Sequence, residues 1–332
     1  MLLDTEFSSK FKNKRHAINA RTFYNHRLIS SLKYLIGEFA KVYSYDCDSL
    51  RQILENIDLK KKLSPWLFYL NSQLLICVKQ NDLVRAKSML TGKFVSPYSN
   101  ERVDLRNFGK KDWDESIKID IENIKEKDKQ GRSAYIKPAS NENFINAKES
   151  LDKAIALIKA NHKVAASYID TFVSEIVIFD GAVVMGMTDV KVYGSVYIRL
   201  PNKVFDPVVY FCEHLIHEMS HLFLHAFFAE DQILLNGQAE RYDAPIREDK
   251  RPLYGIFHAT FVLSRMIRVF EKIINNNPNK DHFEISLQTF YLQFALGFYT
   301  IQKHAKLTPK GLLIHNSMQD IANKVKVGQK IS

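Results

Sequence analysis

The sequence has 332 residues, of which 46% are hydrophobic and 25% charged, and its formal net charge is +10. This composition excludes a disordered chain, and the length suffices for one large domain or two smaller ones. The three cysteines are scattered and odd in number, so neither a disulfide framework nor a cysteine metal site is indicated.

The first part of the chain is predicted to be mostly helical. Apolar residues recur at three- and four-residue spacing between residues 8 and 92, and Trp66–Val78 has the character of a buried helix. A basic run from Lys10 to Lys33 contains no acidic residue. It is most simply a solvated helix face, but it could also hold an acidic peptide segment. Because no RNA- or DNA-binding module is recognisable, nucleic acid is not an expected partner.

The middle of the chain predicts a domain boundary followed by a small sheet. Residues 95–143 are poor in periodic apolar positions and indicate loops with one solvated helix. A helix resumes near Asn146, and strand-like runs follow at residues 174–186 and 190–201. We therefore expect a helical domain over residues 1–140 that takes part in substrate recognition. A catalytic domain is expected over residues 141–332.

Residues 206–230 contain the strongest chemical signal. On a helical wheel this stretch places four histidines on one narrow face and apolar residues on the other. Within it, residues 217–221 form an HExxH motif, in which His217 and His221 lie one turn apart and can reach one metal ion. His214 and His225 are expected to line the cavity instead. A small sheet that precedes an HExxH helix is typical of a zincin-like core, so the predicted fold is α+β and predominantly helical.

Two histidines leave a metal under-coordinated, so a third ligand is expected from elsewhere in the chain. His258 lies in the first two turns of a predicted helix that starts at Pro252, and it is the preferred candidate. It could instead be a packed core histidine. The remaining candidates are acidic residues of the preceding loop, Glu240, Asp243, Glu248 and Asp249.

Arg251 lies seven residues before His258, which corresponds to two helical turns and predicts a shared helix face. A guanidinium there could clamp a carboxylate beside the metal, although a solvent-exposed arginine at a helix start is the plain alternative. Gly255, one turn before His258, is expected to allow close approach of two helices.

The stretch HLIHEMSH, followed by YDAPIREDKRPLYGIFHATF, resembles the HExxH-type peptide-modification proteins of ribosomal peptide natural-product pathways. Members of that family are 2-oxoglutarate-dependent iron peptide β-hydroxylases. The resemblance covers residues 185–275 approximately, and its most specific part is the R-x-x-x-R-P-x-x-G-x-x-H run. It departs from the family in the long helical N-terminal half and in lacking a tryptophan near Arg247.

The resemblance implies an oxygenase that hydroxylates a side chain of a ribosomally made peptide. His217, His221 and His258 would bind Fe(II), and Arg251 with Arg247 would bind the distal carboxylate of 2-oxoglutarate. In this reading the partner is a peptide with an acidic segment, and Glu218 has no obligatory role.

Two alternatives remain open. A zinc metallopeptidase would use Glu218 as the general base that activates water. A peptide-binding protein without activity would keep the metal as a structural clip. Residues 1–21 lack the apolar segment of a signal peptide, and no unbroken apolar stretch has the length of a membrane span, so we expect a cytoplasmic protein without membrane contact.

Overall fold

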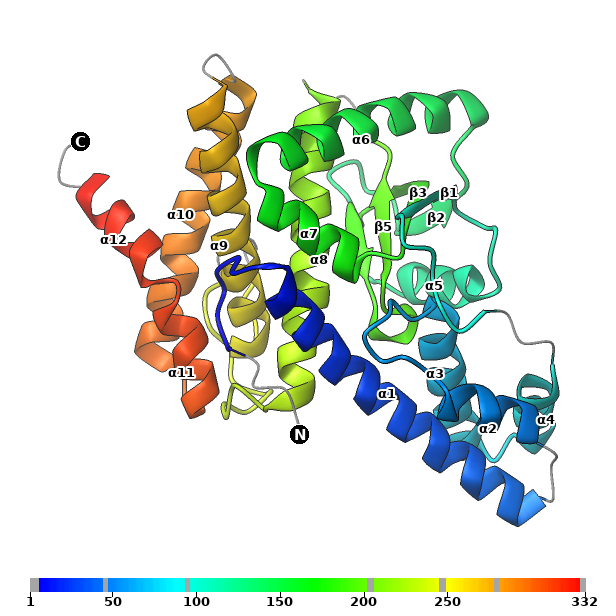
Figure 1. Ribbon diagram of the computed structural model, residues 1–332. Coiled ribbons are helices and arrows are strands. Elements are labelled where there is room, and N and C mark those ends of the chain that lie inside the picture. The colour runs from blue at the N-terminus through cyan, green and yellow to red at the C-terminus, as the bar shows by residue number, and fades with distance from the viewer. Residues whose placement is uncertain are drawn as a thin grey trace. The chain divides into compact units, whose positions relative to one another are not determined.

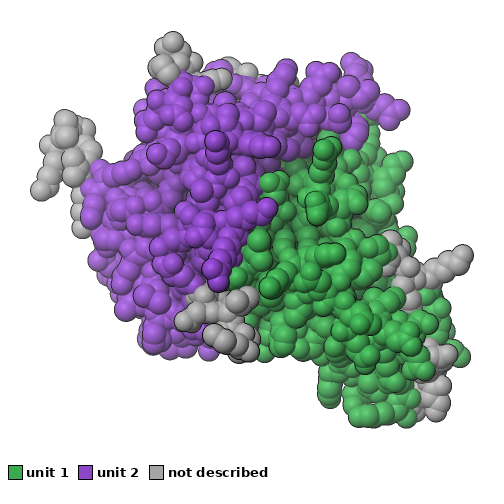
Figure 2. Space-filling model, in the orientation of Figure 1, with its two compact units in different colours: residues 1–3, 18–140, 170–199 green, residues 4–17, 141–169, 200–332 purple. Residues whose placement is uncertain are grey.

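The computed structural model describes residues 6–43, 47–92, 96–201, 206–244, 249–277 and 281–328 (Figure 1). The chain forms two compact units that are each assembled from several segments (Figure 2). Unit 1 comprises residues 1–3, 18–140 and 170–199, and unit 2 comprises residues 4–17, 141–169 and 200–332. The two units are therefore interleaved in the sequence. One passage from unit 1 to unit 2 falls after Ser140.

Unit 1 contains a mixed sheet of five strands among the described residues. Strands β1 (Asp104–Asn107), β3 (Glu175–Ala182) and β5 (Ser195–Arg199) pair in parallel, with β3 in the centre. Strand β4 (Gly186–Thr188) pairs antiparallel with β5, and β2 (Tyr135–Lys137) antiparallel with β3. The expected strands before the HExxH helix are thus present. They are preceded by two short strands that the sequence did not indicate.

The helices of unit 1 follow the predicted periodicity over residues 8–92. Asn13 begins the first helix, because its side-chain oxygen accepts a hydrogen bond from the backbone N–H of His16 at 2.9 Å. Ser64 and Pro65 begin the third in the same way. The helices are α1 (Lys14–Tyr43, from Ile18 onward in unit 1), α2 (Asp48–Glu55), α3 (Pro65–Gln80), α4 (Leu83–Thr91) and α5 (Trp113–Glu122), with the 3₁₀ turn η1 (Val190–Val192).

Helix α5 corrects the expectation of a solvated helix between residues 95 and 143. Trp113, Ile117 and Ile121 recur every four residues and are buried in one apolar cluster with Val177 and Tyr197 of the sheet. The charged residues between these positions obscured a short apolar stripe in the sequence. This region is therefore part of the core of unit 1.

A buried ionic network joins β1, α5 and β3. Arg106 donates two hydrogen bonds to Asp114, at 2.6 and 2.9 Å, and two to Glu175, both at 2.8 Å. Ser195 donates to Glu175 at 2.7 Å, and Tyr197 donates to Asp114 at 3.0 Å. Burial alone would lower the pKa of Arg106, but the hydrogen bonds that it donates to Glu175 and Asp114 outweigh burial and raise that pKa. The guanidinium therefore stays charged and compensates two buried carboxylates.

Unit 2 is helical. Helix α8 packs against α6 and α9, and α10 packs against α9 and α12 (Figure 1). The helices are α6 (Asn141–Asn161), α7 (Lys163–Phe172, up to Ile169 in unit 2), α8 (Pro207–Glu230), α9 (Leu253–Asn276), α10 (Asp281–His304), α11 (Pro309–Asn316) and α12 (Gln319–Gly328).

Helix α9 lies at the core of unit 2. In the described part of the chain it alone has the length and apolar composition of a membrane span, and 78% of its most apolar window is buried inside the structure. A buried central helix of a folded unit has the same composition, because all of its faces contact other elements.

The basic run near residues 10–33 does not form one surface. Lys10 pairs with Asp320 at 3.5 Å and Lys12 with Glu6 at 2.6 Å, all within unit 2. Arg21 is buried in unit 1 and donates to backbone carbonyls. The exposed members are Lys12, which keeps its ion pair, and Lys14, Arg15, Arg27 and Lys33.

Replacing Arg106 by methionine should destabilise the protein, because Asp114 and Glu175 would stay buried without their counter-charge. We expect the free energy of unfolding in urea to fall by about 3–5 kcal/mol. The matched control is Arg132→Met, which removes the ion pair of Arg132 with Asp128 at the surface and should change the free energy of unfolding far less. Equal losses in the two variants would show that the network does not stabilise the fold.

Candidate functional site

Helix α8 is set by strong local signals at its start. Asp206 accepts hydrogen bonds from the backbone N–H groups of Val208 and Val209 at 2.8 and 3.3 Å, and Pro207 occupies the first helical position. The helix then runs without a break to Glu230. The HExxH motif therefore lies on one continuous helix, as the sequence predicted.

The two faces of α8 differ as expected. Leu215, Met219 and Leu222 have no exposed surface and form the back of the helix in unit 2. His217 and His221 are partly exposed on the other side. The apolar back thus fixes the helix, while the histidine face keeps access to ligands.

His214 and His225 have separate surroundings. The His214 ring stacks on Tyr210 at 4.0 Å, and its Nδ1–H donates to the Tyr210 carbonyl at 2.8 Å. The ring of His225 lies 5.4 Å from the ring of His258. That His214 and His225 support the ligands or line a cavity stays a prediction.

Helix α9 brings His258 against α8. The rings of His221 and His258 stack with centroids 5.6 Å apart, and the rings of His217 and His221 lie 4.8 Å apart. His258 is buried, and among the described residues its Nε2 atom has no hydrogen-bond partner. The three predicted ligands therefore form one row of imidazoles contributed by two adjacent helices.

The nitrogen atoms of this row are close together but do not share one point. The Nε2 atoms of His217 and His221 are 3.1 Å apart, which is close to the separation of about 3.0–3.4 Å between two imidazole nitrogens on one ion. His221 presents its other nitrogen, Nδ1, to Nδ1 of His258 at 3.4 Å. Within the described ranges no three acidic, histidine or cysteine side chains converge as a ligand set. Joint ligation by all three histidines would require one ring to turn.

Burial keeps the histidines of the row neutral, which is the form that binds metals. It lowers the pKa of His217 to about 4 and that of His258 to about 3, and it holds the pKa of His221 well below its usual range. Neighbouring imidazoles add to the effect, since a first positive charge disfavours a second. At neutral pH the row therefore presents lone pairs without competition from protons.

Two carboxylates lie on α8 near the row. Glu218 of the motif is buried, with 4% of its surface exposed. The second is Glu213, which lies outside the HExxH motif. It is four residues before His217 and so lies one turn away on the same side of the helix. Burial raises the pKa of Glu213 to about 7. The spacing of four residues was the signal in the sequence that could have identified it.

Aromatic side chains enclose His258. Its ring lies 4.3 Å from Tyr254 of α9 and 5.0 Å from Phe228 of α8, and these two rings are 4.8 Å apart. Tyr254 is partly exposed. Apolar walls of this kind lower the local dielectric and account for the low pKa of the imidazole.

The prediction that Arg251 shares a helix face with His258 is wrong. Helix α9 begins at Leu253, and Arg251 lies before it in an extended bridge, with paired backbone hydrogen bonds to Tyr242 at 2.9 and 2.8 Å. Pro252 explains this, because it disfavours helical geometry in the residue before it. The Arg251 side chain pairs with Asp249 at 2.7 Å and is one-third exposed. Arg247 lies outside the described residues.

Gly255 and the acidic residues before α9 have surroundings of their own. Gly255 is exposed, and an added Cβ would meet no atom within 4 Å, so its expected role in close helix packing is wrong. Asp243 is exposed and pairs with Lys250 at 3.8 Å, while Glu240 accepts a hydrogen bond from Tyr242. Glu248 lies outside the described residues.

The low histidine pKa values predict loss of stability in mild acid. Unfolded histidines titrate near about 6.5, so between pH 6.5 and 4 the unfolded chain binds more protons than the folded one. The free energy of unfolding should be fully present above about pH 6.5 and should fall towards pH 4, by at most about 1.4 kcal/mol per pH unit for each buried histidine. Urea unfolding at several pH values measures this.

Glu213 acts in the opposite sense over the same range, because its raised pKa lets the folded chain keep a proton that the unfolded chain releases. The variant Glu213→Gln removes that contribution and should steepen the loss. An unfolding midpoint in this variant that does not change between pH 7 and 4.5 would contradict the neutral histidine row.

Comparisons with known proteins leave the chain without an assigned family. No protein-family model matches it, and a search of curated proteins gives no match either. The function must therefore be inferred from the residues and their geometry.

Proposed function

We propose that the protein is an Fe(II)- and 2-oxoglutarate-dependent oxygenase that hydroxylates a side chain of a ribosomally made peptide. The observation that carries the proposal is the row of neutral imidazoles formed by His217, His221 and His258 on two packed helices. A fold has little reason to pack three histidines in mutual contact unless their lone pairs are used, and among the described residues the buried Nε2 atom of His258 has no hydrogen-bond partner.

The residues of the row fit a metal ion in type and protonation, and His217 and His221 also fit it in spacing. The Nε2 atoms of His217 and His221 have the separation of two ligands of one ion. The Nε2 atom of His258 has no hydrogen-bond partner in the described part of the chain, so its lone pair could bind the same ion. Three imidazole nitrogens leave other positions of an octahedral ion open. When bound there, Fe(II) together with 2-oxoglutarate and O₂ would supply the oxidation chemistry.

Arg251 is one candidate for binding the distal carboxylate of 2-oxoglutarate. Arg251 is close to the start of α9 in sequence and is already paired with Asp249, so a keto acid would have to compete with that carboxylate. A charge-assisted, two-point contact from a guanidinium to the distal carboxylate would favour the exchange. Arg247, four residues earlier in the sequence, is the other candidate.

The proposal also includes the type of core, the recognition of the peptide and the compartment. A mixed sheet followed by the HExxH helix is compatible with a zincin-like core, and the helices of unit 1 would contribute to recognition of the peptide. An acidic segment of the peptide would be held by the exposed members of the basic run, among them Arg27. The expected compartment is the cytoplasm.

A zinc metallopeptidase is the second candidate function, because the same histidines suit Zn²⁺ and Glu218 stands in the motif position of a general base. A peptide-binding protein with a structural metal is the third. The first two predict different turnover, keto-acid consumption or peptide cleavage, whereas the third predicts neither in the metal-loaded protein.

Anaerobic addition of Fe(II) and 2-oxoglutarate should produce a visible charge-transfer absorption band in the wild-type protein, because the keto acid would chelate the iron. His258→Ala should abolish the band by removing a ligand. The matched control is His315→Ala on α11, since His315 is also buried with an Nε2 atom that has no hydrogen-bond partner in the described structure. That variant should keep the band.

Two results would count against the proposed assignment. A band of full intensity in His258→Ala would move the third ligand to the loop acids. The absence of a band in wild-type protein that has bound one equivalent of Fe(II) would remove 2-oxoglutarate from the proposal and favour one of the alternatives.

A further inference from the structure

A fully buried arginine lies behind the HExxH motif. Arg265 of α9 has no exposed surface, and no carboxylate pairs with it among the residues that the structure describes. Burial lowers its pKa to about 9, so the guanidinium is still charged at neutral pH. An unpaired buried charge is costly, and its presence calls for a reason other than the stability of the core.

Arg265 contacts the third and fourth residues of the HExxH motif, Met219 and Ser220. Its Nε donates to Ser220 Oγ at 3.1 Å, and its Nη2 contacts Met219 Sδ at 3.7 Å. Both residues lie on α8 between His217 and His221, with no exposed surface. Arg265 therefore contacts the side of the motif that faces away from the histidine row.

Aromatic rings close around the guanidinium. Its carbon atom lies 3.7 Å from the centre of the Phe11 ring, 4.6 Å from Phe223, 4.8 Å from Tyr168 and 5.8 Å from Phe261. Cation–π attraction to these rings offsets part of the lost hydration. The rings also leave the guanidinium little freedom to move away from Ser220.

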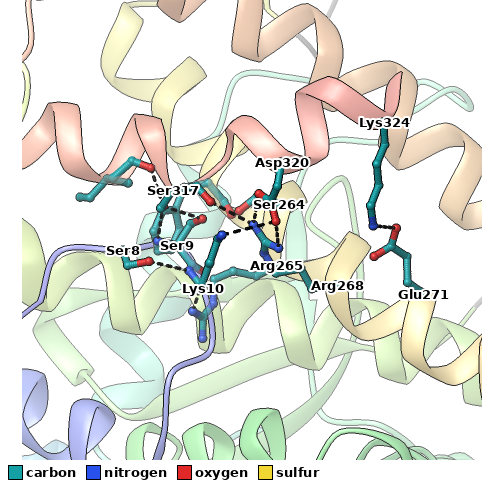
Figure 3. Close-up of polar contacts among 12 residues, drawn as sticks. Ser8, Ser9, Lys10, Ser264, Arg265, Arg268, Glu271, Ser317, Asp320 and Lys324 are labelled. Atoms are coloured by element: carbon teal, nitrogen blue, oxygen red, sulfur yellow. Dashed lines mark hydrogen bonds and ion pairs between the residues drawn. The ribbon is translucent and has the colours of Figure 1, made fainter. Parts of the chain in front are cut away.

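The segment before α1 also contacts the guanidinium of Arg265. Nη1 of Arg265 donates to the Ser9 carbonyl at 3.0 Å, and Ser9 exchanges two hydrogen bonds with Ser317 at 2.8 and 2.9 Å (Figure 3). Lys10 pairs with Asp320, which also accepts two hydrogen bonds from Arg268 at 2.8 Å. The segment is thus anchored to α9, α11 and α12, and it holds the guanidinium from the side opposite α8.

We propose that Arg265 is a positioning residue that fixes the rotation of α8 about its own axis and thereby the direction of His217 and His221. This inference rests on the proposed metal site. An imidazole nitrogen lies about 6 Å from the helix axis, so a rotation of roughly 10° would move it by about 1 Å. A displacement of that size exceeds the tolerance of about 0.5 Å for a preorganised site. The apolar contacts on the back of α8 hold the helix in place but have no preferred direction, whereas the hydrogen bond from Arg265 to Ser220 is directional and resists rotation of α8 about its axis.

The test removes the hydroxyl that Arg265 contacts. Ser220→Ala deletes one oxygen atom, and the matched control Ser264→Ala deletes an equally buried hydroxyl on α9. Each hydroxyl donates to a carbonyl of its own helix at 2.6 Å, but only Ser220 also accepts from Arg265. Co(II) serves as the probe, because its visible absorption reports the ligand geometry. Ser220→Ala should weaken Co(II) binding about tenfold and alter the spectrum, whereas Ser264→Ala should match wild type.

Hydrogen exchange in the metal-free protein separates this inference from the proposed function. Backbone amides around residues 217–223 should exchange faster in Ser220→Ala than in Ser264→Ala. If wild type binds no Co(II) but this difference is found, the metal site fails and the positioning role stands. Equal exchange in the two variants, or unchanged Co(II) affinity and spectrum in Ser220→Ala, would overturn the positioning role.

Discussion

The packing of α9 against α8 is the constraint on which the candidate site depends. It places His258 in stacking contact with His221 and, two turns further along α9, Arg265 against Ser220. Neither contact could form on an isolated helix. The apolar residues of both helices supply most of the driving force, since a buried aliphatic or aromatic side chain contributes about 1.5–3 kcal/mol. The polar contacts add direction, because they hold for only one rotation of each helix.

The same burial determines the electrostatic character of the site. Tyr254, Phe228 and the apolar residues of the two helices surround the row and disfavour the charged form of each imidazole. The row is therefore neutral at a pH at which a free histidine would be partly protonated. Arg265 nevertheless stays charged on the neighbouring helix, because aromatic rings, the Ser9 carbonyl and the Ser220 hydroxyl replace its hydration shell. Unit 1 resolves a similar problem differently, since Arg106 is held by two carboxylates.

Much of the fold could be predicted from periodicity, and the failures have physical causes. The HExxH helix, its apolar back and the approach of His258 follow from spacing and from strong helix-start signals such as Asp206–Pro207. The environment of Arg251 could not be predicted, because two-turn spacing implies a shared face only when the helix includes both residues, and Pro252 ends that continuity. The core role of α5 was obscured by charges between its three apolar positions.

Contacts between residues far apart in the sequence could not be predicted from any local pattern. Nothing in the neighbourhood of Ser9 indicates contact with Arg265, 256 residues later, and the basic character of residues 10–33 suggested a surface instead. The residues of that run have different partners, since Lys10 and Lys12 form ion pairs and Arg21 is buried. A charge pattern in sequence predicts a surface only when the side chains share one exposed face.

Replacing Glu218 provides the most direct test of whether the proposed site supports oxygen chemistry or hydrolysis. In an oxygenase the oxidising power comes from O₂ and the keto acid, so Glu218→Gln loaded with Fe(II) should still convert 2-oxoglutarate to succinate at a measurable rate. In a zinc peptidase the same change removes the base that activates water and should abolish turnover while the metal stays bound. Peptide cleavage by the zinc form that is lost in Glu218→Gln and does not depend on 2-oxoglutarate would contradict the account.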